Sequence, residues 1–287
     1  MTGEPIGSGG AVTGELIGVG VGPGDPELVT VKALRVLREA DAVLVPVMAD
    51  PASGAAAGES GRAETVVRAH IGAGRIRRVP FALNDTGGVT PARRAAWEAA
   101  AREVAAAFGA GAGTVAFATI GDPGVYSTFS YLAQAVRELC PQVTVSSVPG
   151  ITAMQDLAAR SGTVLAEGYE SLVLIPLTAP DGADRVRAAL ASGNCVVAYK
   201  AGAARGRGEA GASGGRGQAG EAGSGFGDVL AAVEEAGRLG DAVYGARLGL
   251  RGEDIRAAGE VAGAAAVPYL STLIIPGRRD RAGSKLR

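Results

Sequence analysis

Residue types that usually carry metal binding and nucleophilic catalysis are scarce in this sequence of 287 residues. It has one histidine, His70, and two cysteines, Cys140 and Cys195, which lie far apart and outside any C-x-x-C spacing. These counts argue against a disulfide framework, a thiolate metal site and a multi-histidine metal site. A histidine-based catalytic triad would depend on His70 alone. We therefore expect no metal site, and we expect both cysteines to be small buried apolar residues.

An excess of one charge sign and long apolar runs are also lacking. The net charge is −1, and Lys and Arg are scattered along the chain, so no segment offers the basic footprint of a nucleic-acid binder. No apolar run approaches the ~20 residues that a membrane span needs. The first residues, MTGEPIGSGGAVTG, lack the pattern of a signal peptide. We expect a cytoplasmic protein with neither a nucleic-acid partner nor a membrane partner.

The chain alternates short β-branched runs with longer helical patterns, which predicts an α/β fold. Strands are expected at residues 15–21, 42–47, 113–119, 142–148, 171–177, 194–200, 241–248 and 268–276. Helices are expected within 26–40, 93–108, 128–139, 153–160, 183–191 and 229–238. We predict two α/β domains with mostly parallel or mixed sheets, one over 14–148 and one over 149–276, divided at the Pro149-Gly150 turn.

Two internal stretches have no apolar periodicity. Residues 201–225 consist mainly of Gly, Ala, Arg, Ser and Glu, and residues 52–64 are a shorter segment of the same kind. Such segments bury too little apolar surface to offset the entropy lost on ordering. We expect a disordered insert over 201–225, an unstructured loop over 52–64, and disordered tails over 1–13 and 277–287.

A glycine-rich turn follows the first predicted strand in GVGVGPGDP, residues 18–26. The sixth position counted from Gly18 is Pro23, so the turn does not fit G-x-G-x-x-G, and the sequence has no G-x-x-x-x-G-K-[ST] run. Asp25 can cap the helix expected from Pro26, and its carboxylate would repel a pyrophosphate there. The glycines let the backbone pass close to a ligand. The turn therefore suits a neutral or cationic nucleoside without phosphates.

Two later turns repeat this arrangement. Gly121-Asp122-Pro123-Gly124 follows the strand expected at 113–119, and Pro149-Gly150 with Thr152 follows the strand expected at 142–148. Ligands of open α/β sheets gather at the carboxyl ends of the strands. We therefore expect the three turns to converge on one pocket.

Together the three motifs resemble those of the tetrapyrrole methylases, class III methyltransferases that use S-adenosylmethionine. That family carries GxGPGDPxLLTxKA near its N-terminus, a GDP loop after the third strand and a VPGIT-type turn. This chain has GVGPGDPELVTVKA at 20–33, GDP at 121–123 and VPGIT at 148–152. The resemblance extends from about Gly14 to Pro276, and it implies a cofactor crevice between the two α/β domains and a homodimer.

Within the family, GDPGVYSTFSYL at 121–132 is similar to a segment of the precorrin-2 C20-methyltransferases, as are VVAYKAG near Lys200 and the PYLSTLIIP ending. Uroporphyrinogen-III C2/C7 methylases carry an acidic residue at the end of the second strand, where this chain has Pro46. The resemblance implies methylation of a tetrapyrrole, precorrin-2 or its cobalt form, at C20 in cobalamin biosynthesis. C11 or C17 methylation is the alternative within the family. An NAD-linked oxidoreductase and a non-catalytic nucleoside-binding module are alternatives from other classes.

Carried over by position, the resemblance also assigns site residues. The residues that it places against S-adenosylmethionine are Pro23, Ile120, Gly121, Asp122, Val125, Thr152, Ala153, Lys200 or its neighbour Tyr199, and Gly249. Asp122 is expected to serve the loop amides or the cofactor's amino group rather than the sulfonium. Tyr126 is the candidate for proton transfer from C20. The arginines available for the substrate's carboxylates are Arg78, Arg93, Arg94 and Arg251.

Overall fold

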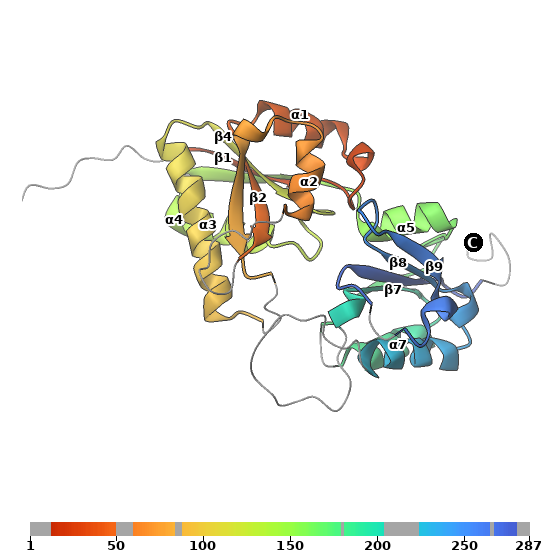
Figure 1. Ribbon diagram of the computed structural model, residues 1–287. Helices are drawn as coiled ribbons and strands as arrows, with labels where there is room; N and C mark the ends of the chain where they lie inside the picture. Colours follow the sequence, from red (N-terminus) through yellow and green to blue (C-terminus); the bar gives the residue numbers. More distant parts are fainter. Residues whose placement is uncertain are drawn as a thin grey trace, which may run out of the picture. The chain divides into compact units, whose positions relative to one another are not determined.

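Five parallel strands form the first of two sheets in the computed structural model, which describes residues 13–49, 60–83, 88–178, 181–203, 224–264 and 267–279 (Figure 1). The chain divides into two units, Met1–Thr152 and Ala153–Arg287, each with its own sheet. The division falls slightly beyond the Pro149-Gly150 turn, which belongs to the first unit. None of the helices in these ranges is both long and apolar enough to cross a membrane.

The first sheet has the order β3-β2-β4-β1-β5, and all of its strand pairs are parallel. Its strands are β1 (Gly14–Gly20), β2 (Ala42–Met48), β3 (Ile76–Phe81), β4 (Thr114–Thr119) and β5 (Val143–Val148). Its helices are η1 (Pro26–Leu28), α1 (Val31–Glu39), α2 (Arg62–Arg68), η2 (Ala73–Arg75), α3 (Pro91–Gly109) and α4 (Phe129–Leu139).

Helices cover both faces of this sheet. Leu16, Leu44 and Phe117 pack with α3 and α4 on one face, while Val43 and Val45 pack with α1 and α2 on the other. A parallel sheet buried on both faces needs strands that are apolar on both sides. The segments ELIGVGV and AVLVPV are apolar on both sides. Because they are buried on both faces, these central strands are near-continuous apolar runs in the sequence.

The second unit has a mixed sheet of order β6-β7-β10-β8-β9, in which β6 and β7 pair in parallel and the other pairs are antiparallel. Its strands are β6 (Leu172–Pro176), β7 (Cys195–Tyr199), β8 (Val243–Ala246), β9 (Asp254–Ala257) and β10 (Ser271–Ile275). Its helices are α5 (Ala153–Ser161), α6 (Gly182–Ala191), η3 (Ala201–Ala203), α7 (Ser224–Glu235), η4 (Leu239–Asp241) and η5 (Ala258–Val261). α6 and α7 share a core with one face, and α5 packs on the other.

The eight predicted strands are present with slightly shifted ends, and both cysteines are buried as predicted. The helix expected over 26–40 is divided: Asp25 caps only η1, and Thr30 caps α1 through a hydrogen bond from the Ala33 N–H. The loop expected over 52–64 is wrong at its end, because α2 begins at Arg62; residues 52–59 lie outside the described residues. Two edge strands, β3 and β9, lie outside the predicted strands.

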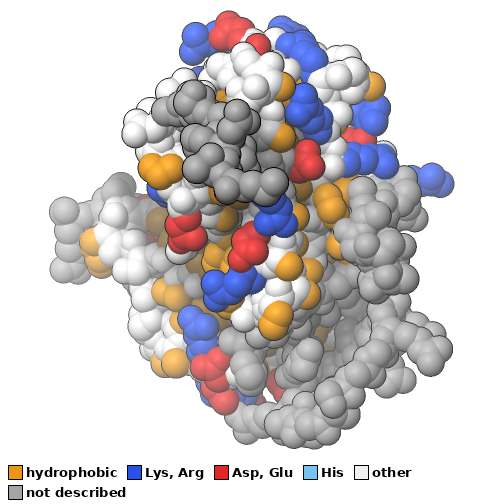
Figure 2. All heavy atoms as spheres, turned by 90° about the vertical axis from the view of Figure 1, so that its left-hand side faces the viewer, with side chains coloured by type: hydrophobic (Ala, Val, Ile, Leu, Met, Phe, Trp, Pro, Cys, Tyr) orange, Lys and Arg blue, Asp and Glu red, His pale blue; other side chains and the backbone are white. Residues whose placement is uncertain are grey.

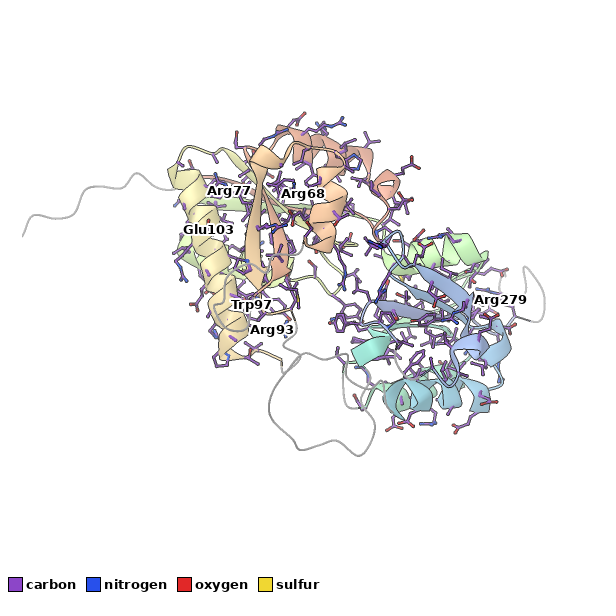
Figure 3. The ribbon with its side chains drawn as sticks, viewed as in Figure 1. Arg68, Arg77, Arg93, Trp97, Glu103 and Arg279 are labelled. Carbon is purple, nitrogen blue, oxygen red and sulfur yellow. The ribbon has the colours of Figure 1, made fainter. Side chains whose placement is uncertain are left out.

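Parts of the expected disordered segments also have defined structure. Of 201–225, residues 201–203 form η3 and 224–225 begin α7, while 204–223 lie outside the described residues. Of the C-terminal tail, Arg279 pairs with Glu170 and Glu167 and is labelled in Figure 3, whereas 280–287 lie outside the described residues. Residues 1–12 of the N-terminal tail are likewise outside them.

Candidate functional site

The three predicted turns meet at the carboxyl edge of the first sheet. The carbonyl oxygen of Gly22 accepts a hydrogen bond from the N–H of Gly121 at 2.7 Å, which joins the first turn to the second. Asp122 joins the second turn to the third: its Oδ1 accepts from the Gly124 N–H at 2.7 Å, and its Oδ2 accepts from the Gly150 N–H at 3.0 Å. The predicted convergence of these turns is therefore present within the first unit.

Glycine is required at this junction by the chain's own packing. A Cβ on Gly150 would lie 2.1 Å from the carbonyl oxygen of Gly121, and a Cβ on Gly20 would lie 2.5 Å from the nitrogen of Gly150. A Cβ on Gly22, where φ is +79°, would lie 2.8 Å from the carbonyl oxygen of Leu28. The sequence reading assigned the glycine-rich turn to close approach of a ligand. At these positions the approaching atoms are the protein's own: backbone atoms of Gly121 and Gly150 in the neighbouring turns, and of Leu28 in η1.

Gly121 differs from Gly20, Gly22 and Gly150 of the junction. Its φ of +69° favours glycine, but a Cβ there would meet no atom within 4 Å, so its backbone borders open space. The N–H groups of Gly121, Gly124 and Gly150 all donate to acceptors inside the junction. A phosphate needs such backbone donors, whereas an uncharged or cationic nucleoside does not. The donor chemistry of the turns therefore fits a cofactor without phosphates, such as S-adenosylmethionine.

Side chains beside the junction fix the segment that leads into α4. Ser127 Oγ lies 2.9 Å from Thr119 Oγ1 and accepts from the Phe129 N–H at 3.1 Å. The Phe129 ring packs against Gly18, where a Cβ would lie 2.4 Å from a ring carbon. Tyr126, in the same segment, has a φ of +50°, which residues other than glycine adopt rarely and often at functional sites. Its side chain is 44% exposed.

The single histidine supports the turn that follows Gly24. His70 Nε2 lies 2.8 Å from the carbonyl oxygen of Pro26, and because a carbonyl only accepts, the ring nitrogen donates. Asp25 Oδ1 accepts from the Glu27 N–H at 2.8 Å and so caps η1. His70 thus holds η1 from the end of α2, a role that its sequence surroundings do not indicate.

A buried carboxylate links α2 to β3, and nothing in its sequence surroundings singles it out. Glu64 is fully buried, and both of its oxygens accept from Arg78 Nε, at 3.0 and 2.9 Å, while Oε1 also accepts from Arg68 Nε at 2.8 Å. Burial raises the pKa of Glu64, but the hydrogen bonds from Arg78, Arg68 and the Gly61 N–H outweigh it, so the net pKa lies below its usual range. Arg78, one of the arginines considered for substrate binding, is therefore engaged by Glu64.

Three predicted cofactor residues lie in the second unit. Ala153 begins α5, directly after Thr152, and the next N–H, that of Met154, donates to the Tyr199 hydroxyl at 3.0 Å. Lys200 follows β7 with a φ of +61°, and its Nζ lies 5.9 Å from the centre of the Tyr269 ring. The end of β7 and the start of α5 are therefore bound to each other.

Gly249, the last predicted cofactor residue, has a φ of +67°, and its N–H donates to Glu253 Oε2 at 2.6 Å. Glu253 also pairs with Arg160 of α5 through two hydrogen bonds of 2.5 Å. The hydrogen bond from Arg160, which outweighs desolvation, lowers the pKa of Glu253. This ion pair fixes the Gly249 loop to α5 in the same unit as Ala153 and Lys200.

Comparison with known proteins identifies related chains. Residues 15–261 match the family model described as Tetrapyrrole (Corrin/Porphyrin) Methylases. The chain is 30% identical over 279 residues to the precorrin-2 C(20)-methyltransferase of Sinorhizobium sp, covering 95% of this chain and 99% of that protein. It is 31% identical over 275 residues to the cobalamin biosynthesis protein CobIJ of Mycobacterium tuberculosis, covering 94% of this chain and 47% of CobIJ. The chain thus spans about half the length of CobIJ.

A solved structure shares the fold. The crystal structure of the methyltransferase CobJ aligns with a TM-score of 0.57 and 21% sequence identity, covering 93% of this chain and 97% of CobJ. This likeness is consistent with the two-sheet α/β architecture predicted from the sequence.

Proposed function

This chain belongs to the tetrapyrrole (corrin/porphyrin) methylases, and from that premise we propose that it transfers a methyl group from S-adenosylmethionine to C20 of precorrin-2 or its cobalt form, in cobalamin biosynthesis. The name of the Sinorhizobium relative, which this chain matches over 99% of its length, supports the C20 position. The observation that carries the proposal is the junction of the three turns around Asp122. The backbone N–H groups of Gly121, Gly124 and Gly150 in these turns already donate to acceptors within the protein.

The residues proposed to hold the cofactor fall into two sets. The first unit contributes Pro23, Ile120, Gly121, Asp122, Val125 and Thr152, and the second contributes Ala153, Lys200 and Gly249. S-adenosylmethionine supplies an electrophilic methyl group on a sulfonium. Gly121 offers an unobstructed backbone, and Ile120, partly buried against the core, offers an apolar surface. Neither places a charge beside the sulfonium.

Asp122 acts in this proposal as a positioning residue. A carboxylate close to the sulfonium would stabilise the reactant more than the transition state, because the positive charge is lost during transfer. Both oxygens of Asp122 accept from backbone N–H groups instead. Its charge is thereby used to hold the second and third turns in register, which agrees with the role expected from the sequence.

Transfer of a methyl group to carbon is an in-line displacement, so the chain's contribution is alignment. Holding the reacting atoms about 3–3.5 Å apart in line is worth up to roughly 7–11 kcal/mol. The junction supplies rigidity for this purpose, since Gly20, Gly121 and Gly150 are in backbone contact. The proton that leaves C20 goes either through the Tyr126 hydroxyl or to water. Unchanged turnover in Tyr126→Phe would assign it to water.

Product analysis tests the proposed function directly. Purified protein is incubated with methyl-labelled S-adenosylmethionine and either precorrin-2 or its cobalt form, and the product is examined by mass spectrometry and ¹³C NMR. We expect one labelled methyl group, bonded to C20. A label at C11 or C17 would keep the family and overturn the position. Binding of S-adenosylhomocysteine without turnover of either substrate would favour a nucleoside-binding module, and calorimetric binding of NAD instead would favour an oxidoreductase.

A further inference from the structure

An arginine and two aromatic rings form a cluster where α3 packs against α4. The rings of Trp97 and Tyr131 are stacked, with centres 4.3 Å apart and planes 4° from parallel. The guanidinium carbon of Arg93 lies 5.5 Å from the centre of the Trp97 ring and 5.8 Å from that of Tyr131. Trp97 is buried and Tyr131 is 39% exposed. The arginine therefore lies against both rings of the stack, and one of these rings reaches the surface.

The cluster lies at the edge of the sheet that carries the turn junction. α3 follows the carboxyl end of β3, and α4 follows the carboxyl end of β4; these strands run in parallel, so both helices begin at that edge. Arg93 and Trp97 occupy the first turns of α3, at its lower end in Figure 3, and Tyr131 occupies the first turn of α4. Two residues before Tyr131, Phe129 packs against Gly18.

Among the described residues, no carboxylate forms a salt bridge with Arg93, and its Nη1 donates to the carbonyl oxygen of Gly88 at 2.6 Å. Arg78, by contrast, is bound to Glu64, and Arg94 and Arg251 are exposed. Figure 2 shows basic and acidic side chains interspersed over the face that it presents. Of the four arginines considered from the sequence, Arg93 combines contacts to two aromatic rings with the absence of a salt bridge among the described residues.

We propose that Arg93, held by Trp97 and Tyr131, binds a carboxylate side chain of the tetrapyrrole substrate. A planar guanidinium recognises a carboxylate through two parallel hydrogen bonds, and such charge-assisted bonds are stronger than neutral ones. An arginine already ordered by stacking loses less side-chain entropy on binding than a free one. The proposal rests on the proposed function, because it takes the substrate to be a polycarboxylate macrocycle.

Trp97 is the only tryptophan of the chain, so its fluorescence reports binding next to Arg93. The wild type, Arg93→Gln and Arg102→Gln are titrated with sirohydrochlorin, the oxidised form of precorrin-2, and quenching of the Trp97 fluorescence gives each Kd. We expect Arg93→Gln to weaken binding about tenfold, because the neutral amide can keep at most one of the two hydrogen bonds and loses the charge. Arg102→Gln, at an exposed position of the same helix, is the matched control and should bind as the wild type does. The Kd for S-adenosylhomocysteine, measured by calorimetry, should stay unchanged in both variants.

Further measurements distinguish a failure of the Arg93 proposal from misfolding of a variant and from a failure of the proposed C20 function. Arg93→Lys retains the charge without the planar fork, and we expect severalfold weaker binding; this variant carries the test if Arg93→Gln does not fold. Equal sirohydrochlorin Kd values for the wild type and either Arg93 variant would overturn the proposal, whether or not the variant melts at a lower temperature. A wild type that binds S-adenosylhomocysteine but not sirohydrochlorin would overturn both this proposal and the C20 function.

Discussion

The carboxylate of Asp122 accepts a hydrogen bond from the backbone N–H of Gly150 at 3.0 Å, although 28 positions separate the two residues in the sequence. The same carboxylate accepts from Gly124 within its own loop. One side chain thus fixes the distance between the loop after β4 and the turn after β5. Changes at this pair should affect cofactor binding without any contact to the cofactor being removed.

Replacing Asp122 by asparagine tests that link. The amide has one oxygen, so one of the two N–H groups loses its acceptor and faces another donor. We expect the free energy of unfolding to fall by about 1–2 kcal/mol and the Kd for S-adenosylhomocysteine to rise about tenfold. Urea denaturation and calorimetry measure the two quantities. Asp25→Asn is the control, because Asp25 caps a single N–H and asparagine caps equally well. An Asp122→Asn protein with wild-type values in both measurements removes Asp122 from the site.

A methyl group at Gly150 tests the backbone contact itself. In Gly150→Ala the new Cβ would lie 2.1 Å from the Gly121 carbonyl oxygen, so the turns must separate. We expect a loss of about 3 kcal/mol in the free energy of unfolding and no measurable binding of S-adenosylhomocysteine. Gly109→Ala, at the end of α3 with no atom within 4 Å of the new Cβ, should be neutral or stabilising by up to about 1 kcal/mol. Equal stabilities for the two variants would contradict the geometry.

The meeting of the three turns was predictable, because each follows a strand and parallel strands share an edge for their carboxyl ends. The atoms that require glycine at these positions were not predictable. Gly18 is opposed by Phe129, and Gly20 by Gly150, through contacts that join distant segments. The positions of the glycines in the sequence indicate that small residues are needed there. They do not indicate which atoms from distant segments leave no room for a side chain. The stacking of Trp97 on Tyr131 is hidden in the same way, since the two rings come from different helices.

The link that Glu64 makes between α2 and β3 was unpredictable for a different reason. The segment before α2 is rich in glycine, alanine and serine, and its composition is typical of a loop. The buried carboxylate of Glu64 is stabilised by hydrogen bonds from Arg78, which belongs to β3. This edge strand carries two arginines and Pro80. Proline is tolerated at sheet edges, so a weak strand pattern there is compatible with a real strand. Both α2 and β3 have weak hydrophobic periodicity, so the ion pair between Glu64 and Arg78 could not be predicted from a sequence pattern.

The lowered pKa of Glu64 predicts how stability depends on pH. Because the folded-state pKa lies below the ordinary value of 4.5, the carboxylate's contribution is fully present above about pH 4.5 and is lost as the pH falls through the folded-state pKa. Glu64→Gln should lower the free energy of unfolding at pH 7 by about 2 kcal/mol. The difference between the two proteins should shrink as the pH falls below 4.5 and through the folded-state pKa.

Urea denaturation across that range measures the effect. Glu98→Gln, at an exposed position of α3, is the control and should follow the wild-type curve. Parallel curves for wild type and Glu64→Gln at all pH values would mean that the Arg78 and Arg68 interactions do not favour the charged carboxylate.

The order of strands in the second sheet has a consequence for synthesis on the ribosome. β10, made last, lies between β7 and β8 in the middle of that sheet. A nascent chain that has emerged only as far as β9 leaves the facing edges of β7 and β8 without their shared neighbour, whereas the first sheet is complete in sequence at β5. Pausing translation before Ser271 should therefore leave the edges of β7 and β8 unpaired, and we expect chaperones to bind this incomplete sheet. Pausing after residue 152 should not have this effect.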